Sequence, residues 1–96
     1  MNVEVEGGEE MEMQAGQRHY ELIEAELARA ARHGARFASL HEAYAVIFEE
    51  LDEIWDITRM KRRDRDREDL QKEFIQLAAM AVKAIQSLDN FVGGSV

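Results

Sequence analysis

The sequence predicts an all-α domain that self-associates, because its apolar residues recur at helical spacing and nothing in the chain breaks a helix. Amphipathic periods of three to four residues cover segments 18–34, 40–60 and 68–91. The chain has no proline and no cysteine, so kinked helices, disulfides and thiolate metal sites are not expected. We expect an antiparallel hairpin of the second and third helices with the N-terminal helix packed across it, completed into a four-helix-type bundle by another copy of the chain.

Size and charge narrow the classes of partner. A domain of 96 residues buries a modest share of its surface, so partner surface would help its stability. The net charge of −8 repels phosphate backbones and anionic lipid, which argues against duplex nucleic acid as a partner. The longest strongly apolar stretch, residues 77–82, is too short to cross a membrane, and the acidic N-terminus does not resemble a signal peptide. We therefore expect a soluble, cytoplasmic protein without a membrane partner.

Three regions follow from the composition. Residues 1–16 are acidic, contain Gly7-Gly8 and lack a sustained apolar period, so we expect a mobile tail, with one short strand at Val3 and Val5 as the alternative. Residues 17–92 form the helical domain, and residues 93–96 a flexible C-terminus. The first helix is expected to end near Gly34, a natural C-terminal glycine after a cationic last turn.

Capping signals set the bounds of the hairpin. Ser39 followed by Glu42 is typical of a capping box at the start of the second helix, and Asp64 or Asp66 is expected to cap the third. Tyr44 and Trp55 belong to the apolar stripe of the second helix, which favours packing in a core or an interface over stacking on a base. The third helix carries an apolar arc wider than one partner helix needs, which again predicts oligomerisation.

The segment Glu49-Glu50-Leu51-Asp52-Glu53 is the candidate for chemistry. Glu50 and Glu53 are three residues apart and so lie on one side of a helix, where both can offer oxygens to one ion. Glu73 lies at the edge of the apolar face of the third helix, so antiparallel packing can bring it to the same place. Three carboxylates with open positions for water and phosphate suit Mg²⁺, with Mn²⁺ as the alternative ion. In so acidic a chain, a solvated face is the commoner meaning of the same pattern.

Residues 39–88 resemble the MazG-like branch of the all-α nucleotide pyrophosphohydrolases. The resemblance rests on His41-Glu42-Ala43-Tyr44, on Glu49 to Asp56 and on Glu73-Phe74-Ile75-Gln76. It implies that Glu50, Glu53 and Glu73 are metal ligands and that Glu49 is an auxiliary acid. Gln76 stands where the family motif has an aspartate. An amide oxygen can coordinate Mg²⁺ but brings no charge, so weaker metal binding, a single-metal site and lost activity all remain open.

The implied activity is magnesium-dependent hydrolysis of a nucleoside triphosphate to a monophosphate and pyrophosphate. The expected substrate is a deoxynucleotide or a damaged nucleotide. Glu49 or Glu53 would orient the attacking water, and Lys61 or, as second choice, Lys83 would contact phosphate. The alternative is a non-catalytic helical oligomerisation or regulatory module with a degenerate metal site, for which Gln76 is the main argument. The sequence does not determine which nucleobase the substrate carries. It also does not determine whether the assembly is a dimer or a tetramer.

Overall fold

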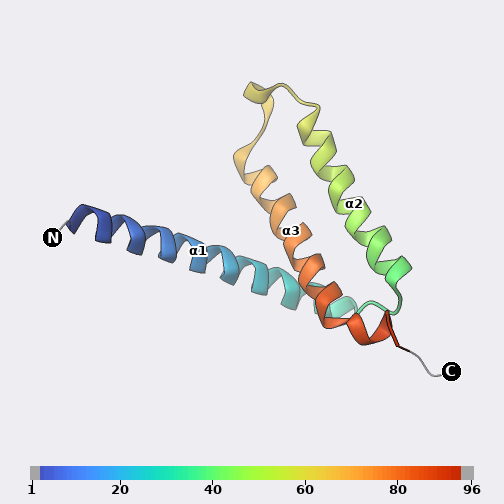
Figure 1. The fold of residues 1–96 in the computed structure, drawn as a ribbon. Helices are drawn as coiled ribbons and strands as arrows, with labels where there is room; N and C mark the ends of the chain where they lie inside the picture. Colours follow the sequence, from blue (N-terminus) through green and yellow to red (C-terminus); the bar gives the residue numbers. More distant parts are fainter. Residues whose placement is uncertain (1–2, 94–96) are drawn as a thin grey trace.

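The computed structural model describes residues 3–93, with side chains from residue 16 onward, and confirms the all-α prediction. The helices are α1 (Val3–Ala30), α2 (Leu40–Thr58) and α3 (Arg67–Gln86), with short 3-10 turns at Ala31–His33, Arg62–Asp64 and Leu88–Asn90. Figure 1 shows α2 and α3 as an antiparallel hairpin, with α1 crossing α3 near one end of the hairpin and its N-terminal half extending beyond it. Within the described residues there is no strand, and no helix is both long and apolar enough to cross a membrane.

The first helix is longer than the sequence predicts. It begins at Val3 instead of near Arg18, so residues 3–16 are helical and the alternative short strand at Val3 and Val5 is wrong. The segment contains no proline and consists mainly of Glu, Met, Gln and Ala, strong helix formers that outweigh the cost of Gly7 and Gly8. Residues 1–2 of the predicted tail, and residues 94–96 of the predicted flexible C-terminus, lie outside the described part of the chain.

The predicted caps of the hairpin helices are present. The Ser39 hydroxyl accepts a hydrogen bond from the backbone N–H of Glu42 at 3.1 Å. Of the two candidate caps for α3, Asp66 serves, because its Oδ1 accepts from the backbone N–H groups of Glu68 and Asp69 at 2.8 and 3.3 Å. Both helices end earlier than expected, α2 at Thr58 and α3 at Gln86.

The charged connection between α2 and α3 is held by hydrogen bonds from the Arg65 side chain to backbone carbonyls. Arg65 donates from Nη2 to the carbonyl oxygen of Thr58 at 2.8 Å and from Nε to that of Ile57 at 3.3 Å. These bonds satisfy carbonyls at the C-terminus of α2, where a cation also complements the helix dipole. Among residues 16–93, no ion pair lies within segment 61–67, although Arg59 just before it pairs with Asp56.

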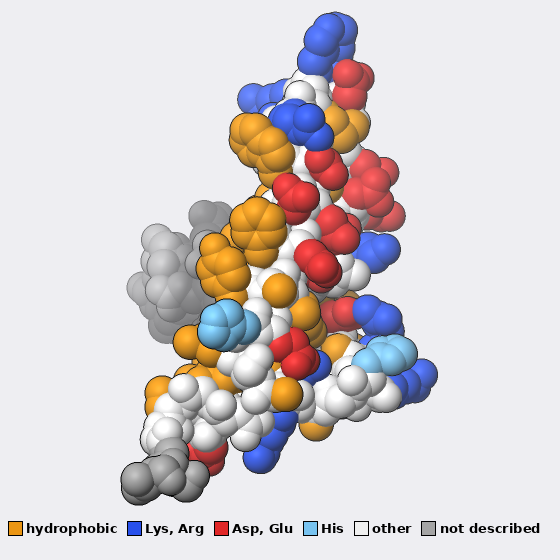
Figure 2. Space-filling model, turned by 90° about the vertical axis from the view of Figure 1, so that its right-hand side faces the viewer, with side chains coloured by type: hydrophobic (Ala, Val, Ile, Leu, Met, Phe, Trp, Pro, Cys, Tyr) orange, Lys and Arg blue, Asp and Glu red, His pale blue; other side chains and the backbone are white. Residues whose placement is uncertain are grey.

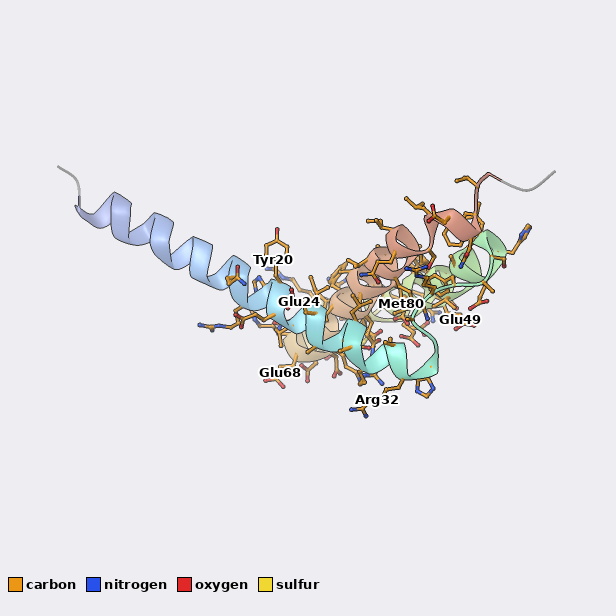
Figure 3. All side chains as sticks on the ribbon, turned by 90° about the horizontal axis from the view of Figure 1, so that it is seen from below. Tyr20, Glu24, Arg32, Glu49, Glu68 and Met80 are labelled. Carbon is orange, nitrogen blue, oxygen red and sulfur yellow. The ribbon has the colours of Figure 1, made fainter. Side chains whose placement is uncertain are left out.

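A small core fastens α1 and the following loop to the hairpin. It consists of Phe37, Ala43, Ala79 and Met80. The backbone N–H of Phe37 donates to the Ser87 hydroxyl at 2.9 Å, and this hydroxyl donates to the carbonyl oxygen of Lys83 at 2.6 Å. Asn90 Nδ2 donates to the Phe37 carbonyl at 2.8 Å. Figure 3 labels Met80 close to the crossing of α1 and α3, so this core fixes the angle at which α1 leaves the hairpin.

Much of the predicted apolar stripe faces solvent. Tyr44, Phe48, Leu51 and Trp55 follow one another at helical spacing on α2, and these four residues are named here the α2 ridge. Tyr44 is 70% exposed and Trp55 55%, so neither belongs to the core, and their packing in an interface stays a prediction. Figure 2 shows a column of hydrophobic side chains along the hairpin beside a column of acidic ones. The residues of α2 that face the rest of the chain include the smaller Ala43, Val46 and Ile47.

The apolar arc of α3 is divided in the same way. Ala79 and Met80 are buried, whereas Phe74, Ile85 and Leu88 are at least half exposed. One side of the arc therefore packs within the chain, and the other is left without a partner in the part of the chain that the structure describes.

Candidate metal centre

Packing of α2 against α3 brings three carboxylates together. One side-chain oxygen from each of Glu50, Glu53 and Glu73 lies within 4.8 Å of the others. Glu50 and Glu53 are one turn apart on α2, and the antiparallel run of α3 places Glu73 opposite them. The predicted meeting of these side chains is confirmed, and this set is named here the carboxylate group.

The electrostatics of the carboxylate group show that negative charges are crowded. The pKa of Glu73 is raised to about 7, first by a hydrogen bond with Glu53, then by partial burial and by repulsion from Glu53 and Glu50. The pKa of Glu50 is also raised, chiefly by burial and next by repulsion from Glu53. A cation at this point would relieve the repulsion, so the group is suited to hold one.

Gln76 lies in contact with this group. The hydrogen-bonding pattern assigns the amide orientation in which its nitrogen donates to Oε2 of Glu73 and to Oε2 of Glu50, both at 3.1 Å. Its amide oxygen is then turned away from the two carboxylates. To act as a metal ligand through oxygen, as the resemblance implies, the amide must rotate by half a turn. In the assigned orientation, Gln76 links the two helices through the carboxylates.

The donor set fits a small hard cation. Magnesium binds oxygens at about 2.0–2.1 Å in octahedral geometry, so its ligand atoms are about 3–4 Å apart. Three carboxylate oxygens within 4.8 Å of one another need small rotamer changes to reach that spacing. Glu53 is exposed, while Glu50 and Glu73 are half-buried, so one side of the group stays open for water and phosphate oxygens.

The other predicted site residues differ in whether they border this centre. Glu49 is exposed on α2 and is not part of the carboxylate group, although its charge contributes to the raised pKa of Glu50. Lys61 is exposed in the connection between α2 and α3 and lines none of the cavities described below. Lys83 is buried and lines a pocket together with Glu50 and Gln76.

Two residues of α1 border the centre, and the sequence does not single them out. Glu26 raises the pKa of Glu50 by charge repulsion, and it is held by an ion pair with Arg29 whose Nε–Oε2 distance is 3.0 Å. In the sequence they are an ordinary pair three residues apart on a helix. Only the crossing of α1 over α3 brings them to the site, so no local signal could have found them.

Comparisons of the chain with protein families, with curated proteins and with solved structures give no match in any of the three. The resemblance to the MazG-like family therefore stays a prediction that rests on the motif residues themselves.

Proposed function

We propose that the protein is a magnesium-dependent nucleoside triphosphate pyrophosphohydrolase. The observation that carries this proposal is the carboxylate group, in which two helices bring Glu50, Glu53 and Glu73 within 4.8 Å and raise the pKa of Glu73 to about 7. The motif resemblance supports the reaction class. The overall negative charge supports a metal-mediated reaction, because a polyanionic substrate needs a cation between itself and an acidic site.

The reaction requires an attacking water, a neutralised phosphate chain and a base. The water oxygen bonds to the α-phosphorus while the bond from that phosphorus to the α–β bridging oxygen breaks, and pyrophosphate leaves with the bonding electrons. Magnesium, when bound, neutralises phosphate charge and lowers the pKa of water. Exposed Glu53, or Glu49 one turn earlier on the solvent side, would accept the water proton. Glu50 and Glu73 would hold the metal, and the Gln76 amide would position these two carboxylates.

The test is release of pyrophosphate from a panel of ribo- and deoxynucleoside triphosphates, with and without magnesium. We expect magnesium-dependent release by the parent protein and a loss of at least about 100-fold in Glu50→Gln, a loss of the size that removing one charged transition-state contact produces. Asp52→Asn is the matched control, because Asp52 is an exposed acid of α2 outside the carboxylate group. Release that is equal in parent and Glu50→Gln would show that the site assignment is wrong.

A second candidate function is a non-catalytic helical oligomerisation or regulatory module. The amide of Gln76 favours it, because this neutral group already donates to Glu50 and Glu73 and so partly satisfies them without an ion. A protein of this kind would fold and self-associate normally and release no pyrophosphate from any member of the panel. Gln76→Asp would then leave magnesium binding unchanged.

In both candidates we propose that the chain self-associates through the α2 ridge. At roughly 200 Å² per aromatic side chain, the exposed fractions of Tyr44 (70%), Phe48 (55%) and Trp55 (55%) leave about 360 Å² of aromatic surface in water. Leu51, Phe74 and Ile85 add to it, so the apolar surface exceeds what monomers usually expose and approaches the roughly 800 Å² per partner of a stable interface. Sedimentation should give a dimer or larger species, and a stable folded monomer of the parent at micromolar concentration would contradict the proposal.

A further inference from the structure

Lys83 is a buried cation without an anionic partner among the described residues. Its side chain is 8% exposed, and its Nζ lies 4.5 Å from the centroid of the Phe37 ring. Within residues 16–93 the ion pairs are Arg29–Glu26 and Arg59–Asp56, and no hydrogen bond involves the Lys83 ammonium. This contact supplies no counter-charge and the ammonium nitrogen is not fully enclosed, so an anionic ligand can reach it and pair with it.

This lysine borders a pocket that also reaches the carboxylate group. The pocket has a volume of about 210 Å³ and is named here the Lys83 pocket. Its polar lining consists of Glu26, Arg29, His33, Glu50, Gln76 and Lys83. Arg29 and Lys83 thus line the pocket together with Glu26, the ion-pair partner of Arg29, while Glu50 and Gln76 connect it to the candidate metal centre. A short anion bound to a metal at the carboxylates would reach these cations directly.

A larger groove continues from the same place. It has a volume of about 640 Å³ and lies between α1 and α3, where the two helices diverge from their crossing (Figure 1). Leu22, Ala25 and Ile75 supply its apolar lining, and Gln71 and Lys72 are among its polar residues. The groove shares Glu26, Arg29 and Gln76 with the Lys83 pocket.

The order of lining residues along α3 gives the crevice a direction. Residues 67–76 line the groove and residues 76–83 line the Lys83 pocket, so Gln76 marks the boundary. Gln76 also contacts Glu50 and Glu73, which places the carboxylate group beside that boundary. The three parts therefore follow one another as a groove with apolar lining, a metal-binding position and the pocket that Lys83 lines.

We propose that this crevice holds a nucleoside triphosphate lengthwise, with the β- and γ-phosphates in the Lys83 pocket and the nucleoside in the groove between α1 and α3. The inference rests on the proposed function for the substrate class. The α-phosphate then lies at the Gln76 boundary, next to the carboxylate group, where the bond to the leaving pyrophosphate must break. Lys83 contacts the leaving group, and the apolar groove receives the base, which has little charge and a large flat surface.

The inference is tested by measuring how the two reaction products, pyrophosphate and a nucleoside monophosphate, bind to the protein, and not by measuring turnover. Calorimetric titration with pyrophosphate and magnesium should give an affinity about 10–100-fold lower for Lys83→Met than for the parent, the range for losing a hydrogen bond from a charged group. Methionine keeps the apolar stem of the lysine, so the melting temperature should stay the same or rise. Arg63→Met, which removes an exposed cation that lines none of the pockets, should bind pyrophosphate like the parent.

The groove is tested separately by filling it. Ala25→Phe should weaken binding of a deoxynucleoside monophosphate by about tenfold or more and leave pyrophosphate binding unchanged, since one ring removes much of the space for a base. Ala45→Phe is the matched control, because Ala45 is an exposed alanine on α2 that lines neither this groove nor a pocket that includes Lys83.

The outcomes separate this inference from the proposed function. Unchanged pyrophosphate affinity in Lys83→Met, a lowered melting temperature of that variant, or equal effects of Ala25→Phe and Ala45→Phe would overturn the inference even if nucleotides are hydrolysed. A different result would separate the two proposals the other way. If both products bind, the variants lose affinity as expected, and no triphosphate releases pyrophosphate, the inference is supported and the proposed enzymatic function is refuted.

Discussion

The raised pKa of Glu73 predicts that magnesium binding depends on pH in a range where ordinary carboxylates do not titrate. The folded carboxyl has a pKa of about 7, against an ordinary value of 4.5. Between these values the folded protein holds a proton that the unfolded chain has lost. The stabilising contribution of this group is therefore fully present below pH 4.5 and is lost as the pH rises through 7. Magnesium needs the ionised form, so below pH 7 it must displace the proton.

The size of the effect follows from the fraction of Glu73 that is ionised. A group with a pKa of about 7 lowers the apparent magnesium affinity about elevenfold at pH 6 and hardly at all at pH 8, a ratio of about tenfold. Calorimetric titrations at pH 6 and pH 8, in buffers with different ionisation enthalpies, would measure both the affinity and the proton released. We expect close to one proton released at pH 6 and little at pH 8. Equal affinity at the two pH values, with no proton release, would refute the account of the carboxylate group.

Three further predictions concern single residues. Gln76→Asp should tighten magnesium binding, since a carboxylate replaces an amide beside Glu50 and Glu73; unchanged affinity with a lower melting temperature would favour the non-catalytic module. Ser87→Ala should lower the free energy of unfolding by about 1–3 kcal/mol, because the buried N–H of Phe37 loses its acceptor; denaturant unfolding measures this, and a change below 0.5 kcal/mol, roughly the effect of an ordinary surface substitution, would contradict it. Phe48→Glu should shift the sedimenting species towards monomer without loss of helix in circular dichroism, whereas an unchanged oligomer would exclude the α2 ridge as the interface.

The helical content and the hairpin could be predicted from sequence because local signals specify them. The Ser39 cap and the apolar periods of α2 and α3 act within a few residues, so their positions were correct apart from helix ends. The start of α1 could not be predicted in the same way, because residues 3–16 lack an apolar period and are helical by propensity alone. Which apolar residues are buried in the core and which are exposed could also not be predicted from the apolar periodicity. Periodicity shows which residues share a face of a helix, but Tyr44 and Met80 differ in burial only through what packs against each.

The sequence by itself determined which side chains were available for a metal site, since Glu50 and Glu53 are joined on one face by helix geometry. Tertiary structure decided the rest. The packing of α2 on α3 brings Glu73 to those two carboxylates, raises its pKa and directs the Gln76 amide at the group instead of at solvent. The crossing of α1 adds Glu26 and Arg29 and encloses Lys83 beside the site. The physical reason is the sequence range of each interaction. Capping and helical periodicity act over one or two turns, whereas burial, charge crowding and pocket shape depend on residues 20 or more positions apart in the chain.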